Sequence, residues 1–138
     1  MHPTDHRLPP LRRLLAAGLL ACVALAAQAA TPSELQRGYA SQAGGASDAS
    51  RGQAFFTQTH GQEWSCASCH GKTPTLDGRH ASTGKTVAPL APAFNADRFT
   101  DAAKVEKWFR RNCKDVAGRE CTAAEKADVL AWLLTLKP

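Results

Sequence analysis

Cys66-Ala67-Ser68-Cys69-His70, near the middle of this 138-residue chain, is its most specific sequence pattern. The spacing Cys-x-x-Cys-His is the attachment sequence of c-type haem. Two residues between the thiols allow both sulfurs to reach the two vinyl groups of one porphyrin, and the next residue places an imidazole beneath the iron. We therefore expect one covalent haem c, with Cys66 and Cys69 as its thioether residues and His70 as the proximal iron ligand.

Other chemistry also uses two cysteines at this spacing, namely zinc knuckles and thioredoxin-like redox sites. The four cysteines after residue 29 could in principle bind one zinc ion: Cys66, Cys69, Cys113 and Cys121. Against this, the chain is expected to be exported to a compartment where cysteines are oxidised. No strand–helix–strand pattern of a thioredoxin-like fold surrounds the motif either.

The first 29 residues predict a cleaved signal peptide. A basic region with three arginines precedes the apolar run Leu14 to Ala27, and Ala27-Gln28-Ala29 is the small-x-small pattern that signal peptidase reads. The run has about 14 residues, fewer than the roughly 20 that a helix needs to cross a bilayer. We expect export to the periplasm, cleavage near Ala29 and no stable membrane insertion. The alternative is a lipoprotein-like box, Leu19-Leu20-Ala21-Cys22.

The two remaining cysteines, Cys113 and Cys121, are close together in the sequence. In an exported protein the simplest assignment is a disulfide, which would stabilise the fold by roughly 2–3 kcal/mol on the chain-entropy estimate. Two free thiols are the alternative.

The rest of the chain predicts an all-α, class I cytochrome c-like single domain over residues 48–138. It follows a flexible segment at residues 30–47, in which Ser33 to Tyr39 could form a short helix. A helix is expected over residues 48–59. Residues 71–99 contain three prolines and predict a long loop along one haem edge, because loops of this length usually border a site. No strand is expected. Three to five helices and this loop would enclose the haem.

Two helices are expected after the loop. Thr100 is the predicted N-cap of the first, with Asp101 at the positive end of the helix dipole. The second opens with the capping box Thr122-x-x-Glu125 and runs to about Leu136. One face of the first helix is marked by residues recurring at i, i+3, i+4 and i+7: Val105, Trp108, Phe109 and Asn112.

The distal iron ligand cannot be methionine, because Met1 is the only methionine and leaves with the signal peptide. The remaining candidates are His60, His80, a lysine, Tyr39, Asn112 or no residue at all. His80 is favoured over His60, which lies only six residues before the motif, because axial ligands often come from such a loop. For Asn112, helix position alone favours a C-cap. It nevertheless lies about 20° from Val105 around the helix, where a polar amide on an apolar face needs a partner.

Six stretches carry a resemblance to a known family: Gly84-Lys85 to Pro92, Arg98-Phe99-Thr100-Asp101, Lys104-Val105-Glu106-Lys107-Trp108-Phe109, Arg111-Asn112-Cys113, Gly118-Arg119-Glu120-Cys121 and Glu125-Lys126-Ala127-Asp128. They resemble the sphaeroides-type haem proteins (SHP). The resemblance covers most of residues 50–138, and the departures are confined to the stretch before Asp48. The resemblance implies His70 as proximal ligand, Asn112 as a distal ligand that leaves the iron on reduction, and a Cys113–Cys121 disulfide beside the haem. Trp108 and Phe109 would then line the distal pocket.

The resemblance also implies function and partners. It implies a cytochrome that takes up an electron and then binds or turns over O₂, NO or CO, with a dihaem cytochrome c and a membrane cytochrome b as redox partners. A simple electron carrier without a ligand-binding role is the alternative. The chain has a formal net charge of +5, but its basic residues look scattered along the sequence, so nucleic-acid binding is not expected.

Overall fold

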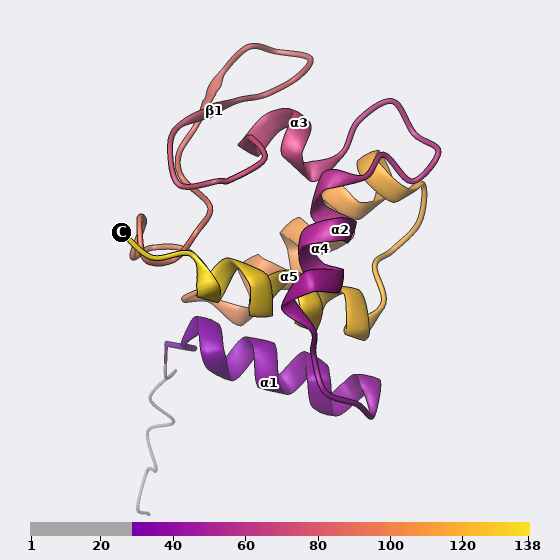
Figure 1. The fold of residues 1–138 in the computed structure, drawn as a ribbon, viewed down its shortest axis with the longest axis vertical. Coiled ribbons are helices and arrows are strands. Elements are labelled where there is room, and N and C mark those ends of the chain that lie inside the picture. Colours follow the sequence, from indigo (N-terminus) through magenta and orange to yellow (C-terminus); the bar gives the residue numbers. More distant parts are fainter. Residues whose placement is uncertain (1–28) are drawn as a thin grey trace, which may run out of the picture.

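A computed structural model describes residues 29–138, so the expected signal peptide and its lipoprotein-like alternative lie almost entirely outside the described residues. The described part is helical, which confirms the all-α expectation (Figure 1). None of its helices combines the length and apolar composition needed to span a bilayer. Its elements are α1 (Pro32–Ala43), α2 (Ala49–Thr57), α3 (Cys66–His70), β1 (Gly78–Arg79), β2 (Thr86–Val87), α4 (Ala102–Ala117) and α5 (Ala123–Thr135).

The backbones of α2 and α5 touch at Gly52. A Cβ atom added there would lie 2.0 Å from the carbonyl oxygen of Asp128, so no residue with a side chain fits without moving a helix. The Asp128 carboxylate, in a residue only 5% exposed, fixes the same crossing. It accepts hydrogen bonds from Arg51 Nε at 2.8 Å and from the backbone N–H of Asp48 at 2.6 Å. Asp48 also caps α2, close to the helix start expected from the sequence.

Helix α5 is the scaffold of the core, because both hydrophobic clusters include its side chains. The first cluster joins α1, α4 and α5 through Tyr39, Val105, Ala127 and Leu130. The second joins α2 and α5 through Phe56, Val129, Trp132 and Leu133. Phe99, just before α4, packs against both clusters. Figure 1 shows α1 and α2 lying against α5.

Helix α1 occupies most of residues 30–47, the segment expected to be flexible. Its start is fixed by a reciprocal capping box, in which Thr31 Oγ1 accepts from the Glu34 N–H at 3.2 Å and the Glu34 carboxylate accepts from the Thr31 N–H at 2.8 Å. Tyr39 is 7% exposed and meets Phe109 edge-on, with ring centroids 5.9 Å apart. The sequence of this segment contains few large apolar residues, and no local pattern shows that the buried Tyr39 docks the helix against the core.

The long loop contains a short hairpin that the sequence reasoning missed. Strands β1 and β2 pair antiparallel, with Gly78 opposite Val87 and Arg79 opposite Thr86. A strand of two residues is too short to show the alternation by which strands are predicted.

The capping residues of α4 differ from those expected from the sequence, whereas both ends of α5 agree with the expectation. The N-cap of α4 is Asp101, whose carboxylate accepts the Lys104 N–H at 2.9 Å, and not Thr100, whose hydroxyl donates to the Asp97 carbonyl. The helix continues to Gly118, which has a φ of 68°, so Asn112 is not a C-cap. At α5 the expected capping box is present and the helix ends before Leu136.

We predict that Gly52→Ala destabilises the protein, because overpacking at a backbone contact costs about 1–3 kcal/mol. Urea unfolding followed by circular dichroism measures this. Gly38→Ala in α1 is the matched control: a Cβ there has no neighbour within 4 Å, and removing a helix-interior glycine should add about 0.5–1 kcal/mol. Equal unfolding midpoints for Gly52→Ala and the unmodified protein would contradict the close crossing.

Candidate haem-binding site

Helix α3 consists of the Cys-x-x-Cys-His motif alone. It begins after Ser65, whose N–H donates to Ser68 Oγ at 3.0 Å. It ends at Gly71, whose φ of 78° favours glycine and whose N–H donates to the Ala67 carbonyl at 2.9 Å. This short helix therefore carries two thiols and an imidazole within five residues.

His70 is half-buried beside Phe56, with ring centroids 6.2 Å apart. Burial, and secondarily the positive charge of Arg98, lowers the pKa of His70 to about 4. The imidazole is therefore neutral at physiological pH, which is the form that binds a metal ion.

The two thiols of the motif are not joined to each other. Cys66 packs against the second hydrophobic cluster, and burial raises the pKa of its thiol to about 11. Cys69 Sγ accepts a hydrogen bond from the Ala81 N–H at 3.2 Å. The hairpin also touches the motif at Gly78, where an added Cβ would lie 2.0 Å from the Cys69 carbonyl oxygen. The hairpin thus fixes one side of α3.

Residues 71–99 are held by hydrogen bonds that the sequence reasoning did not anticipate. The carbonyl oxygen of the buried Pro74 accepts hydrogen bonds from the N–H groups of Leu90 and Ala91, at 3.1 and 3.0 Å. The Arg98 guanidinium donates to the carbonyls of Pro89 and Ala88 at 2.8 and 2.7 Å. The prolines predicted a loop correctly, but no local pattern marks Pro74 as buried or Arg98 as the residue that closes the loop.

The residues expected on the distal side of the haem differ in burial. Phe109 is half-buried against Tyr39, whereas Trp108 is 45% exposed and has the Arg111 guanidinium 5.6 Å from its ring centroid. Asn112 is exposed, and it lies in the interior of the α4 sequence rather than at a helix end. The next residue, Cys113, is buried and forms a disulfide with Cys121, with Cα atoms 5.6 Å apart.

Each of the two histidine alternatives uses one ring nitrogen in a hydrogen bond, which leaves its other ring nitrogen free within residues 29–138. His60 Nε2 lies 2.7 Å from the Phe55 carbonyl oxygen, and its ring stacks on Phe55 with centroids 4.2 Å apart. His80 is exposed in the hairpin, where its Nδ1 lies 3.2 Å from Ser82 Oγ.

Most of the chain is similar to a known c-type cytochrome. It is 51% identical to the cytochrome c-type protein SHP of Cereibacter sphaeroides over 126 residues, which is 88% of this chain and 96% of that protein.

The chain belongs to the SHP family of c-type cytochromes.

The other comparisons agree with this membership. Residues 42–133 match the family described as domain of unknown function DUF1924. The structure matches that of oxidised SHP, described as an oxygen-binding cytochrome c, with a TM-score of 0.73 and 51% identity, covering 78% of this chain and 99% of that one. It also matches the crystal structure of oxidised cytochrome c'' from Methylophilus methylotrophus, with a TM-score of 0.70 and 37% identity, covering 78% and 95%. The class I cytochrome c-like expectation is confirmed.

The donor set of this SHP-family chain fits haem c and not zinc. Cys113 and Cys121 are joined in a disulfide, so the four-cysteine zinc site does not form. Within residues 29–138 no three histidine, cysteine or acidic side chains are grouped to hold a metal ion. Two thiols without a disulfide and a neutral imidazole remain together on α3, which is the set that haem c requires.

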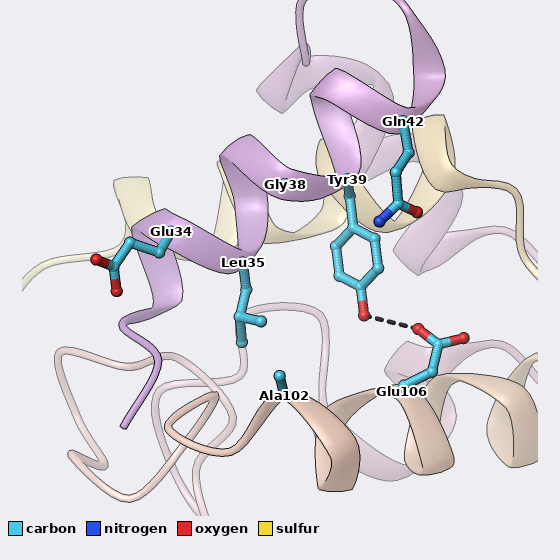
Figure 2. A pocket seen from close by; sticks show the side chains of 7 residues that line it. All are labelled: Glu34, Leu35, Gly38, Tyr39, Gln42, Ala102 and Glu106. Carbon is cyan, nitrogen blue, oxygen red and sulfur yellow. Dashed lines mark hydrogen bonds between the residues drawn. The ribbon is translucent and has the colours of Figure 1, made fainter. Parts of the chain in front are cut away.

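A separate groove of about 250 Å³ lies between α1 and α4 (Figure 2). Tyr39 donates its hydroxyl hydrogen to the Glu106 carboxylate at 2.8 Å, and the ammonium group of Lys126 donates to the same carboxylate at 2.6 Å. None of the expected haem residues lines the groove. Its lining residues are Glu34, Leu35, Gly38, Tyr39, Gln42, Ala102 and Glu106.

We predict that Lys126→Met destabilises the fold by about 1 kcal/mol at pH 7, because the hydrogen bond between the buried Lys126 ammonium group and the Glu106 carboxylate is lost. Solvent screens this pair in part, since the Glu106 side chain is 43% exposed. The Lys126 ammonium, followed by the Tyr39 hydroxyl, lowers the pKa of Glu106. The pair therefore stabilises fully above the ordinary glutamate pKa of about 4.3 and is lost as pH falls through the lowered value.

Denaturant unfolding at several pH values measures this difference between Lys126→Met and the unmodified protein, which should shrink below about pH 4. Lys137→Met, at an exposed terminal lysine, should show no such pH-dependent difference. A difference for Lys126→Met that stays constant from pH 7 to pH 3 would refute the ion pair.

Proposed function

We propose that this protein is an exported monohaem cytochrome c that accepts an electron and then binds a diatomic gas such as O₂, NO or CO. His70 is the permanent iron ligand, and Asn112 is a distal ligand that leaves on reduction. The similarity to SHP, described as an oxygen-binding cytochrome c, carries this proposal.

The proximal half of the site is built on α3. Haem c would supply a redox-active iron to this site. Cys66 and Cys69 would hold the group through thioether bonds, and His70 would donate its imidazole nitrogen. The hairpin contact to Cys69 and the packing of Phe56 beside His70 keep these donors oriented.

The distal half depends on Asn112. No methionine exists in residues 2–138 to compete for the iron, and the resemblance to the SHP family assigns this position to Asn112. An amide oxygen is a neutral, hard donor, so it prefers ferric to ferrous iron and its bond weakens on reduction. The Cys113–Cys121 disulfide anchors the neighbouring backbone and would limit how far Asn112 moves on release. Trp108 and Phe109 would border the space that it leaves.

Export and redox partners complete the proposal. The predicted signal peptide at residues 1–29 would direct the chain to the periplasm, where the Cys113–Cys121 disulfide is stable. The partners that the family resemblance implies are a dihaem cytochrome c and a membrane cytochrome b.

We predict that Asn112→Ala raises the affinity of the ferric protein for azide at least about tenfold, since no side chain then competes for the distal position. Optical titration measures this affinity. The reduced protein should bind CO, seen as a shift of the Soret band, both with and without the substitution.

His60→Ala and His80→Ala are the matched controls and should leave the azide affinity and the ferric spectrum unchanged. If His80→Ala changes the ferric spectrum and Asn112→Ala does not, the ligand assignment fails. If CO leaves the Soret band of the reduced protein unchanged, the gas-binding function fails.

We also predict the covalent composition of the exported protein. Its intact mass after isolation from the periplasm should equal residues 30–138 with one haem and one disulfide. The double variant Cys66→Ala/Cys69→Ala should lack the haem mass. Free haem released from the unmodified protein on denaturation would contradict thioether attachment.

A further inference from the structure

Helix α4 gathers five basic side chains on its outer face, although the basic residues look scattered along the sequence. At 100° per residue they span an arc of about 120°. All five are exposed, and none takes part in the ion pairs found among residues 29–138. We call this surface the α4 basic face; it consists of Lys104, Lys107, Arg110, Arg111 and Lys114.

The α4 basic face is slightly hollowed. A depression of about 380 Å³ is lined by Lys107, Arg110, Arg111, Lys114 and Asp115. Unpaired cations in this number raise the local potential and increase the association rate of an anionic partner.

The α4 basic face is unlike a membrane-binding helix. A helix that lies in a lipid interface needs a free apolar face opposite its basic one. The apolar side of α4 is already covered, because Val105 and Phe109 pack in the first hydrophobic cluster and Val116 is buried. Across residues 29–138 only two large apolar side chains are strongly exposed, Leu76 and Trp108. A protein partner with an acidic surface therefore fits better than a lipid surface.

The α4 basic face also borders the proposed distal site. Arg111 belongs to it and stacks over Trp108, and Asn112 is the next residue along the helix. Trp and Arg are the side chains most enriched at the energetic centres of protein interfaces. A partner seated on this surface would lie next to the residues assigned to the distal side of the haem.

We propose that the α4 basic face is the docking surface for an acidic electron-donor protein, an inference that rests on the proposed function. The donor passes one electron to the ferric iron and is itself oxidised by one electron; no bond forms or breaks between the two proteins. Charge complementarity sets the association rate and the orientation of the complex.

The test uses the full haem-loaded protein and an acidic flavodoxin as the probe donor. Lys107→Glu/Lys114→Glu reverses two exposed charges on the α4 basic face and leaves Trp108, Arg111 and Asn112 unchanged. Arg37→Glu/Lys137→Glu makes the same change in net charge at exposed positions on α1 and at the C-terminus. Calorimetry at low ionic strength gives the Kd, and stopped-flow mixing with the flavodoxin hydroquinone gives the second-order rate.

The Lys107→Glu/Lys114→Glu variant should bind flavodoxin at least about tenfold more weakly and lose most of the salt dependence of its reduction rate. The control pair should stay within about twofold of the unmodified protein. Equal losses in both pairs, or no flavodoxin binding by the unmodified protein, would overturn the assignment. So would sedimentation with phosphatidylglycerol vesicles that the Lys107→Glu/Lys114→Glu change abolishes, because the surface would then bind lipid.

CO binding to the reduced proteins separates the two proposals. Normal CO binding with no charge-dependent flavodoxin binding rejects the docking surface alone. Charge-dependent flavodoxin binding without CO binding rejects the gas-binding function alone.

Discussion

The contact between the backbones of α2 and α5 is the constraint on which the site depends. Gly52 permits it, and the buried Asp128 carboxylate holds it by hydrogen bonds from Arg51 and Asp48. This crossing fixes Phe56 against Trp132, with ring centroids 4.9 Å apart, and Phe56 in turn lies beside His70. The position of the haem-binding motif is thus set by a glycine 14 residues before the motif begins.

The circumference of helix α4 is divided between an apolar arc and a basic one. Val105 and Phe109 of the apolar arc join α1 and α5. Asn112 and Trp108 lie at the edge of this arc, between it and the α4 basic face. Phe99 connects α4 to both hydrophobic clusters at a φ of 59°, a backbone strain of about 1–3 kcal/mol in a residue other than glycine. Such strain is maintained when the surrounding structure requires it, and here it aligns α4 with the rest of the core.

The features predicted correctly from the sequence are those with a local residue pattern. The Cys-x-x-Cys-His spacing, the capping box at Thr122 and the single methionine led to the helical cytochrome fold and to a site without methionine. The missed features have no local signature. Helix α1 docks through Tyr39 on Phe109, far away in the sequence; the hairpin strands have two residues each; and Arg98 closes the loop through backbone carbonyls. Asn112 as a C-cap was wrong because Gly118, six residues later, is the better left-handed residue.

The central claim is that iron lies between His70 and a labile Asn112. Crystal structures of the haem-loaded protein before and after reduction test it most directly. The account predicts the His70 imidazole on the iron in both, with the Asn112 amide oxygen bound only in the oxidised form. Another side chain over the iron, or Asn112 bound equally in both forms, would contradict it.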